Sequence, residues 1–585
     1  MNAMPDEAKA TPRVVPPGAV PAPGPHATTA AELDRLLHAW QSRFTAGRSP
    51  STTSLAFLDW AAHALNTPFQ TADLAGTAAG QWQRLARIVS GVEPMLPLPE
   101  GDHRFRDPAW SQPPYSLIVQ AVLLGEAWCA SVVQAPGGMN PGNRRIVGFD
   151  TRQFLDLISP SNWPWLNPEV IAATRDTAGQ NLVEGFGNFL RDHAPGNGPP
   201  QPATAFRLGT DIAATPGKVV LRNTLIELIQ YAPTTPMVAA EPVLIVPAWI
   251  MKYYILDLSP GNSMIRWLVG QGHTVFVVSW RNPDAAMRDT ALDTYRSLGV
   301  MAAIDAVQAI CGDARIHAVG YCLGGTLLAI AAAAMARDGD DRLASLSLLA
   351  AQTDFTEAGE LQLFITEDQL DFLGDMMFSQ GTLSPEQMGS AFLMLRSNDL
   401  VWSQGIRDYL LGEHVAANDL MAWNADGTRL PARMHIEYLR DLFLHNDLAE
   451  GRHRVGPRPV ALGDIKLPMF VVGTERDHIA PWRSVFKLHL LNDGDLTFVL
   501  TSGGHNAGIV SEPGHKRRSF RVRRRGHDER TLGPDEWRDA TKAQDGSWWV
   551  AWDAWLVAQA GAPRTAPPAM AAALGDAPGD YVREH

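Results

Sequence analysis

The chain has 585 residues, of which 45% are hydrophobic and 19% charged, and its formal net charge is −13 at pH 7. This length exceeds one ordinary domain and allows a large buried core, while the acidic balance argues against a nucleic-acid-binding protein. Its three cysteines are an odd and sparse set, which excludes a disulfide framework and favours a reducing, cytoplasmic compartment.

The sequence also lacks the usual signs of a metal site or a membrane segment. No CxxC or HExxH spacing occurs, so we expect no bound metal. The start, MNAMPDEAKATPR, has no apolar core of a secretory signal. The most apolar run, GGTLLAIAAAAMA, is too short to span a bilayer, so no transmembrane segment is expected.

The first part of the chain changes from a Pro- and Ala-rich stretch to helical runs. Residues 1–28 have the composition of a disordered leader. Four apolar side chains of the following run, AAELDRLLHAWQSRF, fall on one helical face: Leu33, Leu36, Leu37 and Trp40. Further helical runs follow, such as SLIVQAVLLGEAWCASVV, and predict a mainly helical N-terminal domain over residues 29–235.

From residue 236 to 585 short apolar, β-rich runs alternate with helical ones. The predicted strands are PVLIVPAW, HTVFVVSW, RIHAVG, LASLSLLAA, PMFVVGT and LTFVLTSG. This alternation predicts an α/β domain with a mostly parallel sheet covered on both faces. Between about 355 and 457 the alternation stops, and this helical, aromatic-rich segment is predicted to be a cap inserted between two strands.

Three predicted strands lead into reactive side chains. RIHAVG runs into Cys322 within GYCLGGT, a glycine-flanked strand–turn–helix pattern of a nucleophile elbow that carries cysteine in place of serine. PMFVVGTERD ends at Asp477 and LTFVLTSGGH ends at His505. Because reactive groups gather beyond the carboxyl ends of parallel strands, and because Cys, Asp, His is the chain order of α/β-hydrolases, we predict a catalytic triad.

Each residue also has a plainer interpretation. A lone buried cysteine is usually a small hydrophobic residue, Asp477 could be a turn residue, and His505 a loop histidine. His478 adjoins Asp477 but points the other way on an extended segment, so a supporting or structural role is expected for it. Cys129 and Cys311 lie in helical runs without a glycine elbow and are interpreted as packing residues.

An oxyanion hole needs two backbone N–H groups near the nucleophile. One belongs to the residue after it, here Leu323. The other comes from the loop after an early strand, VPAWIMKYY, which leaves Ile250 and Met251 as alternatives.

Taken together, these motifs resemble the polyhydroxyalkanoate synthase family. The resemblance rests on TPGKVVLRNTLIELIQYAPTT, YYILDLSPGNSMIRWLVGQGHTVFVVSWRNPD, GYCLGGT, NDLMAWNADGTRLP, DHIAPW and GGHNAG, and it covers roughly residues 100–560. The length and the chain end GSWWVAWDAWL are similar to the class I, short-chain type. The resemblance implies an α/β-hydrolase fold with a cap, a helical N-terminal domain, a homodimer, triad roles for Cys322, Asp477 and His505, and a cap motif bearing Trp423.

The resemblance also implies a reaction. The family polymerises 3-hydroxyacyl-CoA thioesters, here expected to be short ones such as 3-hydroxybutyryl-CoA, into polyester on cytoplasmic granules, releasing CoA and using no cofactor. A cysteine exchanges one thioester for another and keeps the acyl group activated, whereas a serine would form an oxygen ester. Two departures stand out: Met251 replaces a common asparagine, and Asn506 stands where isoleucine is frequent.

The sequence leaves two alternative functions open. A cysteine-dependent thioesterase or hydrolase would employ the same triad with water as the acceptor. A catalytically silent, granule-coating protein is the second alternative, and the intact triad speaks against it.

Two further patterns have open interpretations. Trp548, Trp552 and Trp555 form a stripe on one predicted helix face, which either packs on the sheet or contacts the polymer. The basic stretch 516–525 is either a solvated loop or hairpin, or a contact for the phosphates of CoA through residues such as Arg523 and Arg524.

Overall fold

A computed structural model describes residues 25–45, 47–99, 102–193, 206–395, 402–413, 417–527, 529–570 and 573–585. Most of the predicted leader, residues 1–28, lies outside these ranges. Its last four residues, 25–28, belong to the first helix.

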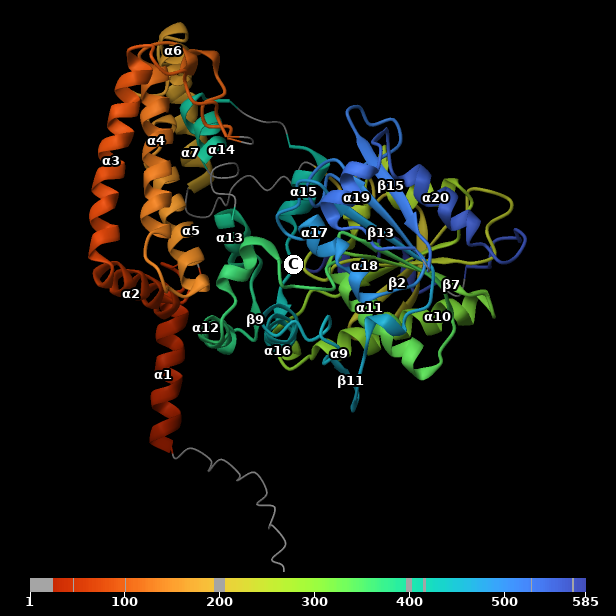
Figure 1. Ribbon diagram of the computed structural model, residues 1–585. Coiled ribbons are helices and arrows are strands. Elements are labelled where there is room, and N and C mark those ends of the chain that lie inside the picture. Colours follow the sequence, from red (N-terminus) through yellow and green to blue (C-terminus); the bar gives the residue numbers. More distant parts are fainter. Residues whose placement is uncertain are drawn as a thin grey trace, which may run out of the picture.

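The N-terminal region is a group of helices that stands beside the sheet domain, coloured red to yellow in Figure 1. They are α1 (Pro25–Gln41), α2 (Pro50–Asn66), α3 (Pro68–Val89), α4 (Tyr115–Gln134), α5 (Pro141–Leu157), α6 (Pro168–Asp176) and α7 (Gln180–His193). Three of them begin at a proline whose preceding residue accepts hydrogen bonds from first-turn amides: Ser49 before α2, Asn140 before α5 and Asn167 before α6. Proline and a side-chain cap favour a helix start at these positions.

Helix α4 is the one helix in the described part of the chain that is long and apolar enough to cross a membrane. The core helix of a soluble bundle meets the same criterion. In α4 the buried Gln120 accepts a hydrogen bond from the amide of Leu96 at 2.8 Å, and Glu126 pairs with Arg104 at 2.6 Å. These polar contacts tie α4 to its neighbours in the helical region.

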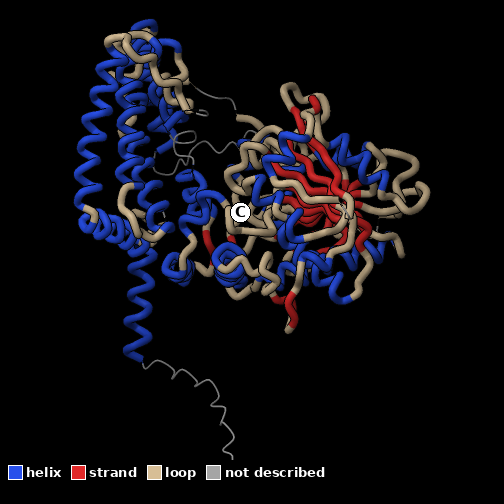
Figure 2. Tube along the Cα trace, in the orientation of Figure 1, coloured by secondary structure: helices blue, strands red, loops and turns tan. Residues whose placement is uncertain are grey.

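One sheet of eleven strands forms the centre of the second domain, seen as the red fan in Figure 2. Its strand order is β16-β15-β14-β13-β8-β7-β3-β6-β2-β1-β17. The strands are β1 (Gly217–Arg222), β2 (Ile226–Tyr231), β3 (Val243–Val246), β6 (Val275–Trp280), β7 (Ile316–Tyr321), β8 (Leu343–Leu349), β13 (Met469–Thr474), β14 (Leu496–Thr501), β15 (Ser519–Arg525), β16 (Gln544–Asp545) and β17 (Gly575–Asp576). The six central strands from β14 to β6 run parallel, and the outer ones are antiparallel. The predicted α/β architecture is confirmed.

The sheet begins earlier in the chain than the predicted domain boundary at residue 236. Strands β1 and β2 form an antiparallel hairpin next to β6. The sequence signal of β1 is weak because it lies near the edge of the sheet, is only partly buried and carries Lys218 and Arg222.

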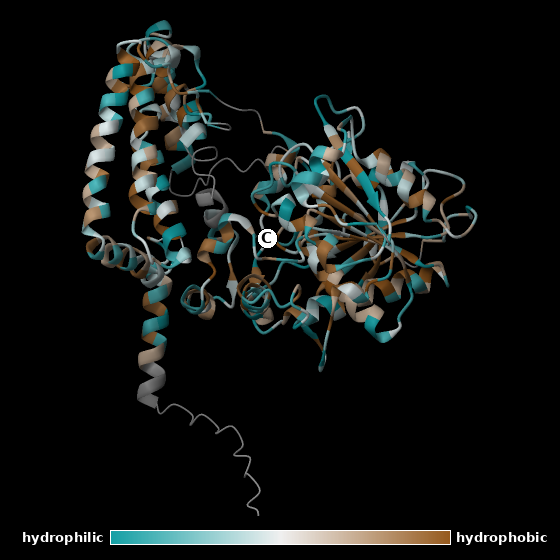
Figure 3. Ribbon diagram, in the orientation of Figure 1, coloured by the Kyte–Doolittle hydropathy of each residue, from teal (hydrophilic) through white to brown (hydrophobic). Residues whose placement is uncertain are grey.

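Side-chain alternation along the central strands creates a core on each face of the sheet. On β3, Leu244 and Val246 belong to one buried cluster, while Val243 and Ile245 belong to the other. The flanking helices are α8 (Met264–Gly270), α9 (Leu292–Thr294), α10 (Ala302–Cys311), α11 (Leu323–Asp338), α17 (Trp482–Phe486), α18 (Leu488–Leu491), α19 (Pro534–Ala540) and α20 (Trp549–Ala558). Figure 3 shows hydrophobic residues concentrated in the strands of the central sheet.

The segment between β8 and β13 contains the predicted cap, residues 355–457. Its elements are α12 (Glu367–Phe378), β9 (Thr382–Leu383), α13 (Pro385–Leu395), α14 (Ser403–Gly405), α15 (Asp419–Ala425), β10 (Leu430–Pro431), α16 (Ala432–Tyr438), β11 (Arg454–Val455) and β12 (Arg458–Pro459). A small hairpin, β4 (Asp257–Ser259) with β5 (Asn262–Ser263), precedes α8. In Figure 1 the cap helices lie between the N-terminal helices and the sheet.

Candidate active site

Cys322 lies on the sharp turn between β7 and α11. Its φ of 52° and ψ of −126° are unusual for a residue with a side chain. Its own amide donates to the carbonyl of Leu349 at 2.9 Å, which fixes the turn to the neighbouring strand β8. This is the strained turn that a nucleophile elbow requires.

The glycines of the elbow are needed because backbone segments approach each other closely. A Cβ added at Gly324 would lie 2.2 Å from the carbonyl oxygen of Val246 and 2.4 Å from that of Pro247. A Cβ at Gly320 would lie 2.3 Å from the Cα of Gly325. The start of α11 is therefore pressed against the end of β3 and the loop that leads to Ile250.

His505 and Asp477 form the rest of the predicted triad. Nδ1 of His505 lies 2.8 Å from Oδ2 of Asp477. The same oxygen accepts from the hydroxyl of Thr474 at 2.7 Å, and Oδ1 accepts from the amides of Ile479 and Ala480 at 2.9 and 2.8 Å. These four donors fix the carboxylate and leave it aimed at the imidazole.

The electrostatics of the three residues are coupled. Burial lowers the pKa of His505, but the negative charges of Asp477 and Cys322, and hydrogen bonds to both side chains, raise it well above its usual range. Burial alone would raise the pKa of Asp477. The charge of His505 and the hydrogen bonds to the carboxylate have a larger effect in the opposite direction, so the pKa of Asp477 is lowered. Since His505 interacts with both partners, the structure brings all three predicted residues together.

The remaining cysteines have a different environment. Cys129 and Cys311 lie within α4 and α10 and are half-buried. Burial raises the pKa of both thiols, that of Cys311 to about 11, which keeps them protonated at neutral pH. His478 follows Asp477, and its carbonyl lies against Gly359 at the start of the cap. The carboxylate of Asp477 pairs with the imidazole of His505.

The loop after β3 is held by the cap. The indole of Trp423 donates to the carbonyl of Lys252 at 2.8 Å, and the hydroxyl of Thr428 bonds to the carbonyl of Ile250. Met251 forms an isolated antiparallel bridge with Gly427. The amide of Leu323 opens α11 and has no acceptor within the helix, as for any first-turn amide.

The last residues of the chain also hold the loop after β3 in place. No sequence pattern indicated this contact. Nζ of Lys252 donates to the carbonyl of Glu584 at 2.5 Å, and Arg429 of the cap donates to the carbonyl of His585 at 3.0 Å. Figure 1 shows the C-terminus lying between the cap and the sheet.

Two tyrosines near the nucleophile were missed by the sequence reasoning. The hydroxyl of Tyr321 donates to Oδ1 of Asn506 at 2.6 Å, so the residue before the cysteine is bonded to the residue after the histidine. Tyr438 of the cap is buried, and burial together with the charge of Cys322 raises its pKa well above the usual range. The aromatic richness of the cap was the signal that could have pointed to Tyr438.

The aromatic stripe packs on the sheet. Trp548 and Trp552 are fully buried, and the indole of Trp552 donates to Ser347 of β8 at 3.0 Å. Of the two interpretations of this helix, packing on the sheet is therefore the one that the structure supports.

The basic stretch is a strand of the sheet rather than a free loop. Arg523 pairs with Glu529 at 3.0 Å, and Arg524 pairs with Asp495 at 2.6 Å. Arg525 is buried and donates to three backbone carbonyls. Arg523 and Arg524 each pair with a carboxylate at the surface, and a contact of this stretch with the phosphates of CoA stays a prediction.

One group of side chains in the described ranges could in principle surround a cation. Ligand atoms of Asp441, His445 and Asp447 lie within 4.8 Å of one another in the cap. None of these residues belongs to the triad, and His445 is exposed while the two aspartates are half-buried. The absence of a metal and of a cofactor remains an expectation.

Family models match both the N-terminal helical region and the sheet domain. Residues 28–70 match the N-terminal model of poly-beta-hydroxybutyrate polymerases, and residues 101–268 match the model of the polymerase N-terminus. Residues 241–512 match the alpha/beta hydrolase fold. The last match contains the elbow and the whole triad.

Curated relatives extend the similarity to most of the chain. The poly(3-hydroxyalkanoate) polymerase of Methylorubrum extorquens is 41% identical over 85% of this chain and 84% of the relative. The polymerase subunits of Rhizobium meliloti (strain 1021) and Cupriavidus necator are each 36% identical, over 87% and 86% of this chain and 84% and 86% of the relatives. The chain therefore belongs to the poly(3-hydroxyalkanoate) polymerase family of acyl-transferring enzymes.

Proposed function

We propose that this enzyme polymerises short 3-hydroxyacyl-CoA thioesters, such as 3-hydroxybutyryl-CoA, through an acyl thioester on Cys322. The observation that carries the proposal is the strained elbow that holds Cys322, together with His505, whose pKa responds to the charge of Cys322 and whose Nδ1 is bonded to Asp477. The names of the relatives supply the class of product.

The first half-reaction transfers the acyl group to the enzyme. Nδ1 of His505 is bonded to Asp477, so the other ring nitrogen accepts the thiol proton of Cys322. The thiolate attacks the thioester carbonyl of the substrate, and the CoA sulfur leaves with the proton from His505. One thioester is exchanged for another, so little of the activation of the acyl group is lost.

The second half-reaction lengthens the chain. The 3-hydroxyl of another unit loses its proton to His505 and attacks the acyl thioester on Cys322, which leaves as a thiolate. We assign the proton transfer to His505 because both oxygens of Asp477 are occupied by four donors. Asp477 then orients the imidazole and stabilises its charged form.

The negative oxygen formed in each step needs hydrogen-bond donors. The amide of Leu323 is the first proposed donor, because it opens α11 beside the nucleophile. The second is the amide of Ile250 or Met251, on the loop pressed against Gly324 and held by Trp423 and Thr428 of the cap.

Polymerisation is proposed over hydrolysis because the two residues that would activate a water molecule are buried, while Cys322 is partly buried. His505 is 6% exposed, the Asp477 side chain is fully buried, and Tyr438 of the cap lies near Cys322. Exclusion of water from an acyl-enzyme prevents its hydrolysis and leaves the hydroxyl of another unit as the acceptor. A cysteine-dependent thioesterase is the second candidate, because it would use the same triad.

The proposed setting is the cytoplasmic surface of a polyester granule, with the enzyme as a homodimer and without a cofactor. The N-terminal helices support it, because they expose large apolar side chains. On α1 the predicted apolar face is exposed: Leu33, Leu36, Leu37 and Trp40. Contiguous exposed apolar surface of this kind is typical of interaction sites.

Incubation with 3-hydroxybutyryl-CoA tests the reaction. We expect free CoA together with water-insoluble polyester. Free 3-hydroxybutyrate with CoA would show a thioesterase instead, and no CoA release would show that the chain is neither enzyme. The Cys322→Ala variant controls for spontaneous thioester cleavage.

A further inference from the structure

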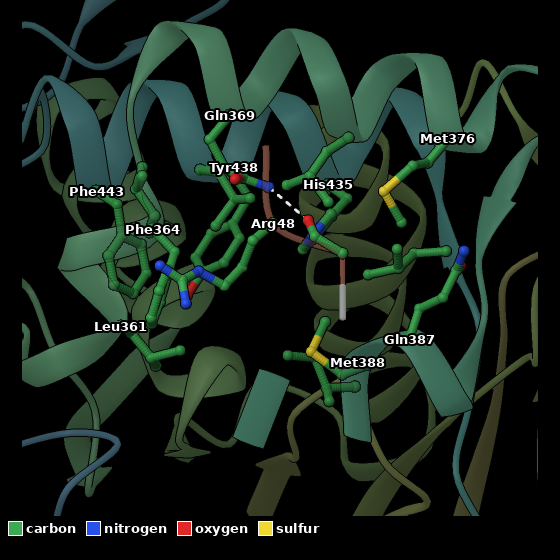
Figure 4. A pocket seen from close by; sticks show the side chains of 16 residues that line it. Arg48, Leu361, Phe364, Gln369, Met376, Gln387, Met388, His435, Tyr438 and Phe443 are labelled. Carbon is green, nitrogen blue, oxygen red and sulfur yellow. Dashed lines mark hydrogen bonds between the residues drawn. The ribbon is translucent and has the colours of Figure 1, made fainter. Parts of the chain in front are cut away.

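A partly open cavity of about 130 Å³ lies under the cap. It is lined by three separate parts of the chain: the cap, the loop after β3, and the N-terminal residues Gly47 and Arg48. Figure 4 shows the side chains that surround it. Most of them are apolar, among them Ile250, Leu373, Met376, Met388, Tyr438 and Phe443.

Two residues of the cavity lining also belong to the surroundings of the nucleophile. Ile250 lies on the loop proposed to complete the oxyanion hole, and Tyr438 is near enough to Cys322 for the charge of the thiolate to raise its pKa. Both residues and Cys322 belong to or pack against one large buried cluster. Ile250 and Tyr438 thus connect the cavity to the nucleophile, which does not itself line it.

One polar side chain in the lining has unused hydrogen-bonding capacity. His435 of α16 is 4% exposed, and its Nδ1 has no hydrogen-bond partner in the described part of the chain. Burial lowers the pKa of His435 to about 4, so the ring is neutral at pH 7. The last torsion of a histidine side chain is soft, so a small ring rotation can turn this nitrogen to a ligand. An unpaired buried polar atom is costly, and a ligand oxygen would relieve that cost.

The start of the N-terminal helical region borders the cavity and is bonded to two neighbouring cap residues, Asp368 through the hydroxyl of Ser49 and Gln369 through the backbone. Nε2 of Gln369 donates to the carbonyl of Gly47 at 2.8 Å, the dashed line in Figure 4, and its Oε1 accepts from the amide of Ser49 at 2.7 Å. Arg48 between them pairs with Asp150 of α5 at 2.6 Å and lies over the ring of Phe364. Residues 47–49, here named the N-terminal strap, are thus bound to both the cap and the helical region.

The volume of the cavity limits the size of its occupant. An engineered apolar cavity of roughly 150 Å³ binds benzene in another protein. A 3-hydroxybutyryl unit has the same number of non-hydrogen atoms as benzene. The cavity is therefore large enough for one short unit.

We propose that this cavity binds one short 3-hydroxyacyl unit next to Cys322, that His435 hydrogen-bonds to an oxygen of that unit, and that the N-terminal strap closes the cavity. The inference rests on the proposed function and deepens it, because it names the part of the protein that sets acyl length. The helical region thereby contributes directly to the substrate site.

The test compares the kcat/KM values of CoA release for 3-hydroxybutyryl-CoA and 3-hydroxyhexanoyl-CoA. Leu373→Ala and Met388→Ala each enlarge the cavity from a different helix. Each should raise the ratio of the longer to the shorter substrate by about tenfold, because two more methylenes become buried. Leu370→Ala is the matched control: it is buried on the same helix as Leu373 but does not line the cavity, so the ratio should stay near the wild-type value.

Two further variants test the hydrogen bond and the strap. His435→Phe keeps the ring but removes the nitrogens, and it should lower kcat/KM for both substrates about tenfold, with partial recovery in His435→Gln. Gln369→Met combined with Ser49→Ala removes the two bonds of Gln369 and the bond from Ser49 to Asp368, and should widen substrate choice as the cavity variants do.

The outcomes separate the inference from the proposed function. A wild type that makes polymer, combined with cavity variants whose ratio matches that of Leu370→Ala, would overturn the cavity assignment alone. A wild type that releases no CoA from either substrate would overturn the proposed function and the inference with it. Met388 is only half-buried, so its variant keeps the test available should Leu373→Ala fail to fold.

Discussion

At the scale of single residues, the proposed mechanism makes the reactivity of Cys322 depend on two residues that are distant in the chain. In this mechanism His505 accepts the thiol proton, and Asp477 holds the imidazole through Nδ1. A thiolate, not a thiol, is the reactive species, so the rate at neutral pH depends on how well His505 holds the proton. The raised pKa of His505 means that the imidazolium persists as the pH rises through the neutral range.

Removal of that imidazole should slow the alkylation of Cys322. We expect His505→Gln to lower the rate of iodoacetamide labelling of Cys322 at pH 7 by at least about tenfold, because the thiolate loses its cationic partner. His478→Gln should stay near the wild-type rate. Labelling is followed by mass spectrometry of the peptide that contains Cys322. A larger effect from His478→Gln would mean that the wrong histidine has been assigned.

The hydrogen bond between Tyr321 and Asn506 should contribute measurably to the free energy of unfolding, and two variants test this. Asn506→Ile leaves the buried hydroxyl of Tyr321 without a partner and should cost about 1–3 kcal/mol of stability. Tyr321→Phe combined with Asn506→Ile removes both polar groups and should recover part of that loss. Thermal unfolding of the single and double variants measures the coupling. Strict additivity of the two changes would show that the bond contributes nothing.

At the scale of elements, the contact between α11 and the end of β3 shapes the site. Gly324→Ala would place a methyl group 2.2 Å from the carbonyl oxygen of Val246, where only backbone movement can make room. We expect a loss of several kcal/mol of stability and of nearly all activity. Gly270→Ala in α8 is the control, since a Cβ there meets nothing within 4 Å. Circular dichroism melting and CoA release are the measurements, and equal behaviour of both variants would contradict this role of the elbow.

The elements that could be predicted are those with strong local signals. The parallel strands, α11 and the triad positions follow from apolar runs that end in glycine, cysteine, aspartate or histidine. Strands β1 and β2 were placed in the wrong domain, because β1 is only partly buried and β2, although buried throughout, carries the polar residues Glu227 and Gln230. The contacts of Tyr438, Gln369 and the C-terminal residues depend on long-range packing, which no local pattern encodes.

At the scale of the whole molecule, three buried neutral histidines make stability depend on pH. Burial lowers the pKa of His317, His435 and His489 to about 4 each. In the unfolded chain they titrate near about 6.5, so the unfolded state binds more protons between these two values. Their contribution is complete above about pH 6.5 and is lost as the pH falls toward about 4.

We therefore expect the thermal unfolding midpoint to fall steadily between about pH 6.5 and 4, beyond the loss from surface charges. His317→Asn should flatten this dependence, whereas substitution of the exposed His515 should not. Differential scanning fluorimetry across this range supplies the midpoints. A midpoint independent of pH, or the same slope in both variants, would contradict the assignment of neutral buried histidines.

The central claim is that polymer grows from a thioester on Cys322, and its most direct test is the trapping of that intermediate. The enzyme is mixed with 3-hydroxybutyryl-CoA, quenched in acid within seconds, digested and analysed by mass spectrometry. We predict hydroxybutyryl groups, single or linked, on the peptide that contains Cys322, and none on the peptides of Cys129 and Cys311. Polymer formation with an unmodified Cys322, or with the acyl group on another residue, would contradict the account.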